Sequence, residues 1–158
     1  MARAREVPGF DCDEPFAVAA ARAVRVRAAE VFEHSGGVLD TGEIDRVHDM
    51  RVATRRLRAA LEVFEAAFPR KRFRKALKKV KALADALGER RDRDVEIEFL
   101  AGFAAAAPAA DQAALEARIE VLREEQRRAN EGLAPQLEEK RLRQLRRRLE
   151  KLARSADR

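Results

Sequence analysis

The chain has 158 residues, of which 46% are hydrophobic and 39% charged, and it carries a formal net charge of +6. A hydrophobic share of this size can form a core, which argues against a disordered chain, and the length suits a single domain. Phe is the only large aromatic residue type, with eight copies and no Trp or Tyr. A surface that binds nucleic-acid bases by stacking would therefore have few rings.

Apolar residues recur three and four positions apart along most of the chain, and no useful stretch alternates with period two, so we predict an all-α fold. A first helix is expected from Asp13 to His34, where a Ser-Gly-Gly sequence stops it. A second helix is expected between Thr41, which can cap it, and Pro69, which ends it. Its seam of core residues advances by steps of three and four: Val47, Met50, Thr54, Leu57, Leu61, Phe64 and Phe68.

A third helix is predicted from the same spacing between Phe73 and Leu87. Gly88 lies where a terminating residue with left-handed backbone is expected. Asp92 or Asp94 can cap a fourth helix, which should end before a proline at position 108.

Helical spacing then continues from Leu115 to Leu137, through Gly132 and Pro135, so we expect a long helix there that the proline can kink. A last basic segment with leucines at 142, 145, 149 and 152 starts out of phase after a step of five. We expect it to be a separate or bent helix that packs loosely or against another chain.

These elements predict an antiparallel bundle of four or more helices. The expected organisation is a lead-in at residues 1–12, a helical bundle at 13–137 and a basic C-terminal helix or tail at 138–158. Within the bundle, a basic groove is expected between the helices at 44–68 and 70–88.

Positive charge is concentrated in one part of the sequence. Residues 46–93 hold sixteen Lys and Arg against six Asp and Glu, a net charge of +10, which leaves −4 for the rest of the chain. On the second helix, four residues each follow a seam residue by one position, about 100° round the helix, and so form one stripe: His48, Arg51, Arg55 and Arg58. On the third helix, Arg74, Lys78 and Lys81 follow the seam by the same offset.

The connection around Pro69 is so short that the second and third helices should pack antiparallel. When antiparallel helices pack seam to seam, the same rotation on each brings side chains to the same side of the pair. Both stripes should therefore border one groove suited to an anion, because an anion relieves the repulsion between crowded cations and Arg binds phosphate through paired hydrogen bonds. The alternative is that long Lys and Arg stems only cover apolar surface and keep their charges in water.

Other chemistry is not indicated by the sequence. His48 has no second His, Cys or carboxylate at metal spacing on its face. Asp92 and Asp94 fit helix capping better than magnesium binding. No nucleophile–base pair and no phosphate-binding Gly loop occurs, so we expect neither an enzyme nor a cofactor nor a metal.

Two segments carry a family resemblance. Residues 47–58 read Val-His-Asp-Met-Arg-Val-Ala-Thr-Arg-Arg-Leu-Arg, and residues 87–95 read Leu-Gly-Glu-Arg-Arg-Asp-Arg-Asp-Val. Together they resemble the CHAD family, the histidine-containing α-helical domains that bind inorganic polyphosphate. The resemblance covers roughly residues 44–100. It implies polyphosphate contacts at His48, Arg51, Arg55, Arg58, Lys81 and Arg91, of which Arg91 comes from the family pattern alone.

Members of the CHAD family usually have two similar helical halves around a basic channel. This chain carries one copy of the His/Arg pattern and resembles a single half. We therefore predict a two-fold symmetric homodimer that brings two basic grooves together.

The predicted function is non-catalytic binding of inorganic polyphosphate in the basic groove. The candidate contacts are His48, Arg51, Arg55, Arg58, Arg74, Lys78, Lys81 and Arg91. Three alternatives stay open. One is a nucleic-acid-binding helical protein that uses the same groove, although no recognised base-reading motif supports it. Another is a phosphate-processing enzyme, which would need a metal-binding cluster of acids. The third is a purely structural or granule-associated dimer that uses the basic tail from Lys140 to Arg154.

The sequence also bears on location. Residues 1–10 are basic but lack a following apolar run, so no signal peptide is expected. No stretch approaches the ~20 apolar residues of a membrane span. Cys12 is the only cysteine, which excludes an intrachain disulfide framework. We therefore predict a cytoplasmic protein, free or associated with polyphosphate or other storage granules.

Overall fold

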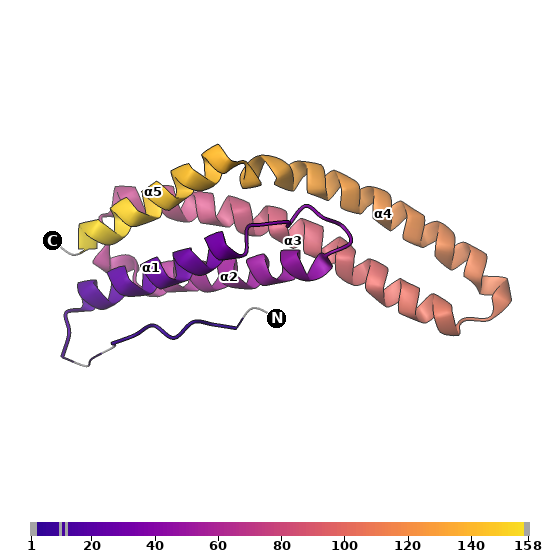
Figure 1. Cartoon of the computed structure of the whole chain (residues 1–158), viewed down its shortest axis with the longest axis horizontal. Helices are drawn as coiled ribbons and strands as arrows, with labels where there is room; N and C mark the ends of the chain where they lie inside the picture. Colours follow the sequence, from indigo (N-terminus) through magenta and orange to yellow (C-terminus); the bar gives the residue numbers. More distant parts are fainter. Residues whose placement is uncertain (1–2, 10, 12, 157–158) are drawn as a thin grey trace.

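The computed structural model describes residues 3–9, 11 and 13–156. These residues form five α-helices and one short 3-10 turn and contain no strand, so the all-α prediction is confirmed. The elements are α1 (Phe16–Glu33), α2 (Ile44–Val63), the 3-10 turn η1 (Glu65–Ala67), α3 (Arg70–Ala106), α4 (Ala109–Leu137) and α5 (Glu139–Ala156) (Figure 1).

Helices α1, α2 and α5 and the first half of α3 form a four-helix bundle. α1 contacts α2 and α5, and α3 contacts the same two helices, so the four follow one another round a common core. Figure 1 shows them side by side at one end of the molecule. Most of the core consists of apolar side chains with little or no exposure: Val24, Val31, Val47, Met50, Leu57, Leu61, Phe73, Val80, Leu83, Leu149 and Leu152.

Helices α3 and α4 form a hairpin that extends beyond the bundle. α3 has 37 residues, about twice the 18 of α1, and is about 55 Å long at ~1.5 Å per residue. Its second half leaves the bundle, and after the turn at Pro108 α4 runs back beside it (Figure 1). α3 therefore belongs to both the bundle and the hairpin.

The seam predicted for the second helix is largely confirmed, but the helix is shorter than expected. Its first five members are fully buried: Val47, Met50, Thr54, Leu57 and Leu61. The hydroxyl of Thr54 donates to the Met50 carbonyl at 2.8 Å, so this polar side chain is satisfied within the core. α2 ends at Val63, and the 3-10 turn connects it to Phe68. The N-terminal cap is Glu43, so the cap predicted at Thr41 is wrong.

The first helix stops just before the Ser-Gly-Gly sequence, as predicted. α1 ends at Glu33, and Gly37 adopts a φ of 68°, which glycine tolerates far better than other residues. A Cβ atom at Gly37 would lie 2.9 Å from a guanidinium nitrogen of Arg46, but that exposed, flexible side chain can move, so the backbone conformation is what favours glycine there.

The helix break predicted at Gly88 is wrong. α3 continues through Gly88, whose φ is not positive, and Asp92 and Asp94 lie inside the helix rather than at a cap. The buried residues of α3 keep steps of three and four through this region: Val80, Leu83, Leu87, Arg90 and Asp94. Packing of that seam favours a continuous helix and outweighs the ~1 kcal/mol that an interior glycine costs relative to alanine.

The last two helices confirm one expectation and correct another. α4 is the predicted long helix, with Pro135 inside it. α5 is a separate helix, and the step of five between Leu137 and Leu142 accommodates the turn at Glu138. The expected loose packing of α5 is wrong, because Leu145 and Leu149 lie in the main core and the helix packs against α1 and α3.

Candidate functional site

The four candidate residues of α2 lie along one edge of its buried seam. His48, Arg51 and Arg58 are half-buried, and Arg55 is exposed. Each follows a fully buried residue by one position, as the sequence predicts. The burial of the seam therefore holds the stems of these side chains against the bundle.

The candidate residues of α3 repeat this arrangement. Arg74 and Lys78 are exposed and Lys81 is half-buried. They follow Phe73 and Val80, which are buried, and Leu77, which is half-buried. We refer to the two rows together as the α2/α3 face: His48, Arg51, Arg55, Arg58, Arg74, Lys78 and Lys81.

The two rows meet at Glu62. Arg58 Nε donates a hydrogen bond of 2.9 Å to Glu62 Oε1, and Lys81 Nζ lies 3.7 Å from the same oxygen. The hydrogen bond from Arg58 is the main cause of a lowered pKa of the Glu62 carboxyl, and the charges of Arg58 and Lys81 lower it further. At this end of the face, cations of α2 and α3 therefore lie on the same side of the helix pair.

Apart from the contacts at Glu62, the α2 row and the α3 row are not linked to each other by hydrogen bonds or ion pairs among the described residues. Among the described residues, no hydrogen bond or ion pair links His48, Arg51 or Arg55 to α3. A hollow of about 460 Å³ lies on the face, and all of its described lining residues belong to α3: Arg74, Leu77, Lys78, Lys81, Ala82 and Asp85. A groove with one side from each helix stays a prediction.

The ion-pair partner of Arg91 lies farther along α3 and is not a residue of the α2/α3 face. Its side chain is 16% exposed, and its Nη2 lies 3.7 Å from Glu98 Oε2 on the same helix. Its Nη1 is buried and has no hydrogen-bond partner among the described residues.

A buried polar cluster beside Arg91 is a feature that sequence reasoning missed. Arg90 and Asp94 are both fully buried and form an ion pair, and Gln126 Nε2 of α4 donates to Asp94 Oδ1 at 2.7 Å. Burial raises the pKa of Asp94 and lowers that of Arg90, and the opposite charge of each partner works against the shift. Asp94 therefore connects the two helices of the hairpin and is not a helix cap.

The comparison with protein families bears on both segments of the candidate site. The family model described as the CHAD domain matches residues 22–158, which include α2, α3, α4, α5 and most of α1. The chain belongs to the CHAD domain family. Comparisons with curated proteins and with solved structures gave no match.

In this CHAD domain, the two segments that carry the resemblance lie on different helices. Residues 47–58 lie in α2, and residues 87–95 lie inside α3. Within the part of the chain that the structure describes, no group of three or more His, Cys, Asp or Glu is placed to hold a metal ion. No described helix combines the length and the hydropathy needed to cross a membrane.

Proposed function

We propose that this CHAD domain binds inorganic polyphosphate, without catalysing its breakdown, through the cations of the α2/α3 face. The observation that carries the proposal is the contact at Glu62, because Arg58 of α2 and Lys81 of α3 interact with the same carboxylate oxygen. Cations of the two helices are thus close enough there to bind one anion. Arg91 is added to the proposed contacts on the family pattern.

The family resemblance and the chemistry of the side chains both favour polyphosphate as the ligand. The resemblance to CHAD proteins implies polyphosphate, and Arg suits phosphate because its planar guanidinium donates paired hydrogen bonds. The α2/α3 face as defined above contains no Phe, Tyr or Trp, and its one ring is the imidazole of His48. Single-stranded nucleic acid would therefore lack a stacking surface there, which favours polyphosphate.

Binding should depend on the number of phosphates engaged. Arg51 and Arg58 are about 10 Å apart along α2 at ~1.5 Å per residue, so the face suits an extended anion. Each charge-assisted hydrogen bond contributes about 1.5–3 kcal/mol before other costs. Longer chains should therefore bind more tightly than shorter ones.

The test is the triple variant Arg51→Ala, Arg55→Ala, Arg58→Ala. We expect its affinity for long-chain polyphosphate to fall by at least about tenfold, or ~1.4 kcal/mol, while its helicity by circular dichroism is unchanged. Titration with polyphosphate at fixed salt measures the affinity.

A matched control removes the same charge from α4, through Arg123→Ala, Arg127→Ala and Arg128→Ala. These three arginines are exposed and pair with Glu120 or Glu124 of their own helix. The control should bind nearly as well as the parent chain. Equal affinity of the two triple variants would contradict the proposal, and tighter binding of RNA or duplex DNA at matched salt would favour a nucleic-acid ligand.

Two further parts belong to this proposal. The chain forms a homodimer, and four large apolar side chains that are 47–71% exposed on the α3–α4 hairpin support association with another copy: Val95, Phe99, Phe103 and Val121.

The protein acts in the cytoplasm, free or associated with polyphosphate or other storage granules, where its ligand would be found.

A further inference from the structure

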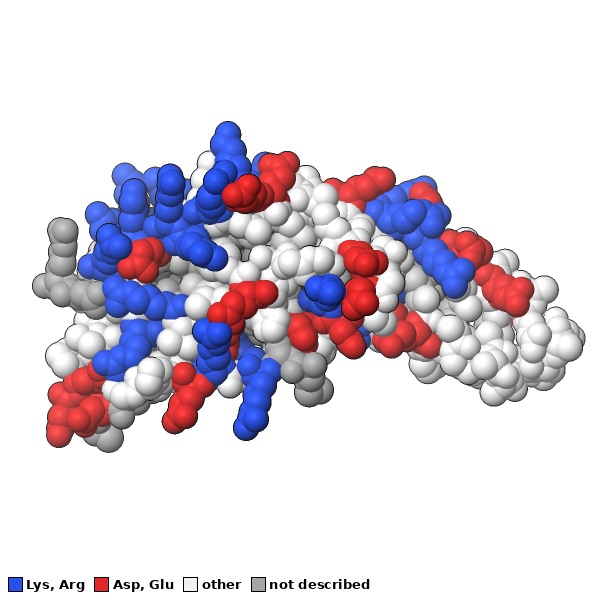
Figure 2. Space-filling view, in the orientation of Figure 1, with Lys and Arg blue, Asp and Glu red and all other residues white. Residues whose placement is uncertain are grey.

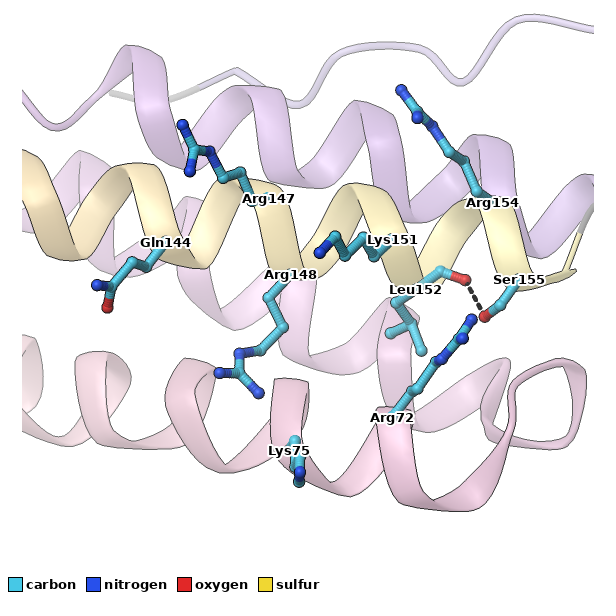
Figure 3. A pocket seen from close by; sticks show the side chains of 9 residues that line it. All are labelled: Arg72, Lys75, Gln144, Arg147, Arg148, Lys151, Leu152, Arg154 and Ser155. Atoms are coloured by element: carbon cyan, nitrogen blue, oxygen red, sulfur yellow. Dashed lines mark hydrogen bonds between the residues drawn. The ribbon is translucent and has the colours of Figure 1, made fainter.

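A second basic surface lies between α3 and α5. A hollow of about 680 Å³ is lined by six cations, which we call the α3/α5 groove: Arg72, Lys75, Arg147, Arg148, Lys151 and Arg154. In Figure 3, Arg148 extends from α5 toward α3 and Arg72 extends from α3 toward α5. Figure 2 shows Lys and Arg side chains gathered over this end of the bundle.

The cations of the α3/α5 groove are largely without acidic partners. Arg154 pairs with Glu150 at 3.0 Å. For the other five, no carboxylate lies within ion-pair distance among residues 3–9, 11 and 13–156, and no acidic residue lines the hollow. The arginines of α4 differ, since Arg123 and Arg127 each pair with a glutamate of the same helix.

Core packing brings these cations together. On α5, Arg148 and Lys151 precede Leu149 and Leu152, which are buried in the bundle core. On α3, Arg72 precedes the buried Phe73 in the same way. Burial of the two apolar seams therefore fixes two cationic rows beside each other, although like charges at close range repel.

The charged surface continues along the two helices. A second hollow of about 440 Å³ also includes Arg148 and adds Lys79, Lys140 and Arg141, with Glu138 as its acid. From Lys140 to Arg154 the surface extends about 21 Å at ~1.5 Å per residue of α5. Its shape and charge suit a linear polyanion better than a single small anion.

We propose that the α3/α5 groove is a second binding site for a linear chain of phosphate groups, separate from the α2/α3 face. Arg72 and Arg148, which extend into the space between α3 and α5 (Figure 3), can each donate paired hydrogen bonds to phosphate, whereas Arg147 and Arg154 extend from the other side of α5 and add positive charge at the rim. The lining contains no aromatic ring on which a base could stack, so an inorganic phosphate chain fits better than single-stranded nucleic acid. The choice of polyphosphate rests on the proposed function, whereas the position of the groove does not.

Counting the sites with short, linear polyphosphate of defined length tests this inference. In titration calorimetry, the parent chain should bind two short chains per protomer. The variant Arg147→Gln, Arg148→Gln, Lys151→Gln should bind one, because glutamine keeps helix propensity but removes the charge. The variant Arg72→Gln, Lys75→Gln changes the α3 side of the groove alone and should lose the same site, which guards against misfolding of α5.

The matched control is Arg123→Gln, Arg127→Gln, Arg128→Gln on α4, which should keep both sites. Equal stoichiometry and affinity of the α5 variant and this control would overturn the second site. An oligonucleotide of equal charge that binds more tightly than polyphosphate, and only when the α5 cations are present, would overturn the assignment to an inorganic chain.

The two proposals fail in different ways. If Arg51→Ala, Arg55→Ala, Arg58→Ala leaves both sites intact while the α5 variant loses one, the function proposed for the α2/α3 face is wrong and the α3/α5 groove stands. The reverse result rejects the groove alone. A parent chain that binds no polyphosphate rejects both.

Discussion

Glu62 is the acid at which the cations of α2 and α3 meet, and it competes with any anion that binds there. Its Oε1 accepts from Arg58 and lies 3.7 Å from Lys81. The pKa of the carboxyl is lowered, mainly by the hydrogen bond from Arg58, so the charge that competes with a ligand persists to lower pH than for an ordinary glutamate. Only as the pH falls through this lowered pKa does protonation release the two cations.

We therefore predict that Glu62→Gln binds polyphosphate more tightly than the parent chain. The amide removes one negative charge and releases Arg58 and Lys81, and an exposed ion pair of this kind corresponds to about a two- to fivefold change in affinity. A titration at neutral pH and moderate salt measures the change. Glu120→Gln is the control, because that exposed glutamate pairs with Arg123 of its own helix, α4, outside both proposed binding surfaces. Unchanged binding of Glu62→Gln would mean that the pair at Glu62 lies outside the binding surface, and weaker binding would mean that Glu62 does not compete with the anion.

Single residues differ in how far the sequence could place them. Arg51 and Arg55 were predictable, because the seam they follow repeats at steps of three and four and is fully buried. Arg90 and Asp94 continue the corresponding seam of α3 with the same steps. They were missed because charged residues are rarely fully buried without a partner, and the partner Gln126 lies on a helix far along the chain.

At the scale of helices, Gly88 is the residue at which the sequence predicts a helix break and the structure shows a continuous α3. Its φ is not positive, and a Cβ atom built there meets nothing within 4 Å outside the local helix backbone. We predict that Gly88→Ala raises the free energy of unfolding by about 0.5–1 kcal/mol, because alanine loses less backbone entropy in a helix interior. Denaturation in urea, followed by circular dichroism, measures the effect.

Gly37→Ala provides the comparison, since Gly37 has a positive φ that other residues adopt only with strain. It should destabilise the protein in the same assay. A loss of stability in Gly88→Ala as well would support a helix that ends at Gly88.

The strong positive charge of α5 is concealed when charges are summed over a longer part of the sequence. Glu139–Ala156 holds eight Lys and Arg against two glutamates, a net charge of +6, within a part of the chain whose total is −4. The sequence identified a basic tail but could not place it, because the partner of its leucine row depends on tertiary packing. Only the bundle shows that these cations lie opposite Arg72 and Lys75.

At the scale of the whole molecule, the hairpin presents an apolar surface that a second copy could cover. Phe99 and Phe103 are 71% and 57% exposed. Figure 2 shows few charged side chains at the far end of the hairpin on the face in view. Exposed apolar side chains grouped in this way favour association, since their burial removes them from water.

We predict that the parent chain sediments as a dimer at micromolar concentration and that Phe99→Ser, Phe103→Ser sediments as a monomer. The control is Val63→Ser, which changes an apolar residue that is 71% exposed at the end of α2. It should leave the dimer intact. A monomeric parent chain in sedimentation equilibrium would remove the homodimer from the proposed function.

The buried cluster of Arg90, Asp94 and Gln126 also limits how the two long helices can align. Asp94 accepts from Arg90 and Gln126 together in this one alignment, and Arg93 of α3 pairs with Glu125 of α4 at 3.0 Å. A slip of α4 by one helical turn, about 5.4 Å, would withdraw the amide of Gln126 and leave the buried carboxylate less satisfied. The cluster therefore fixes the register of α4 against α3.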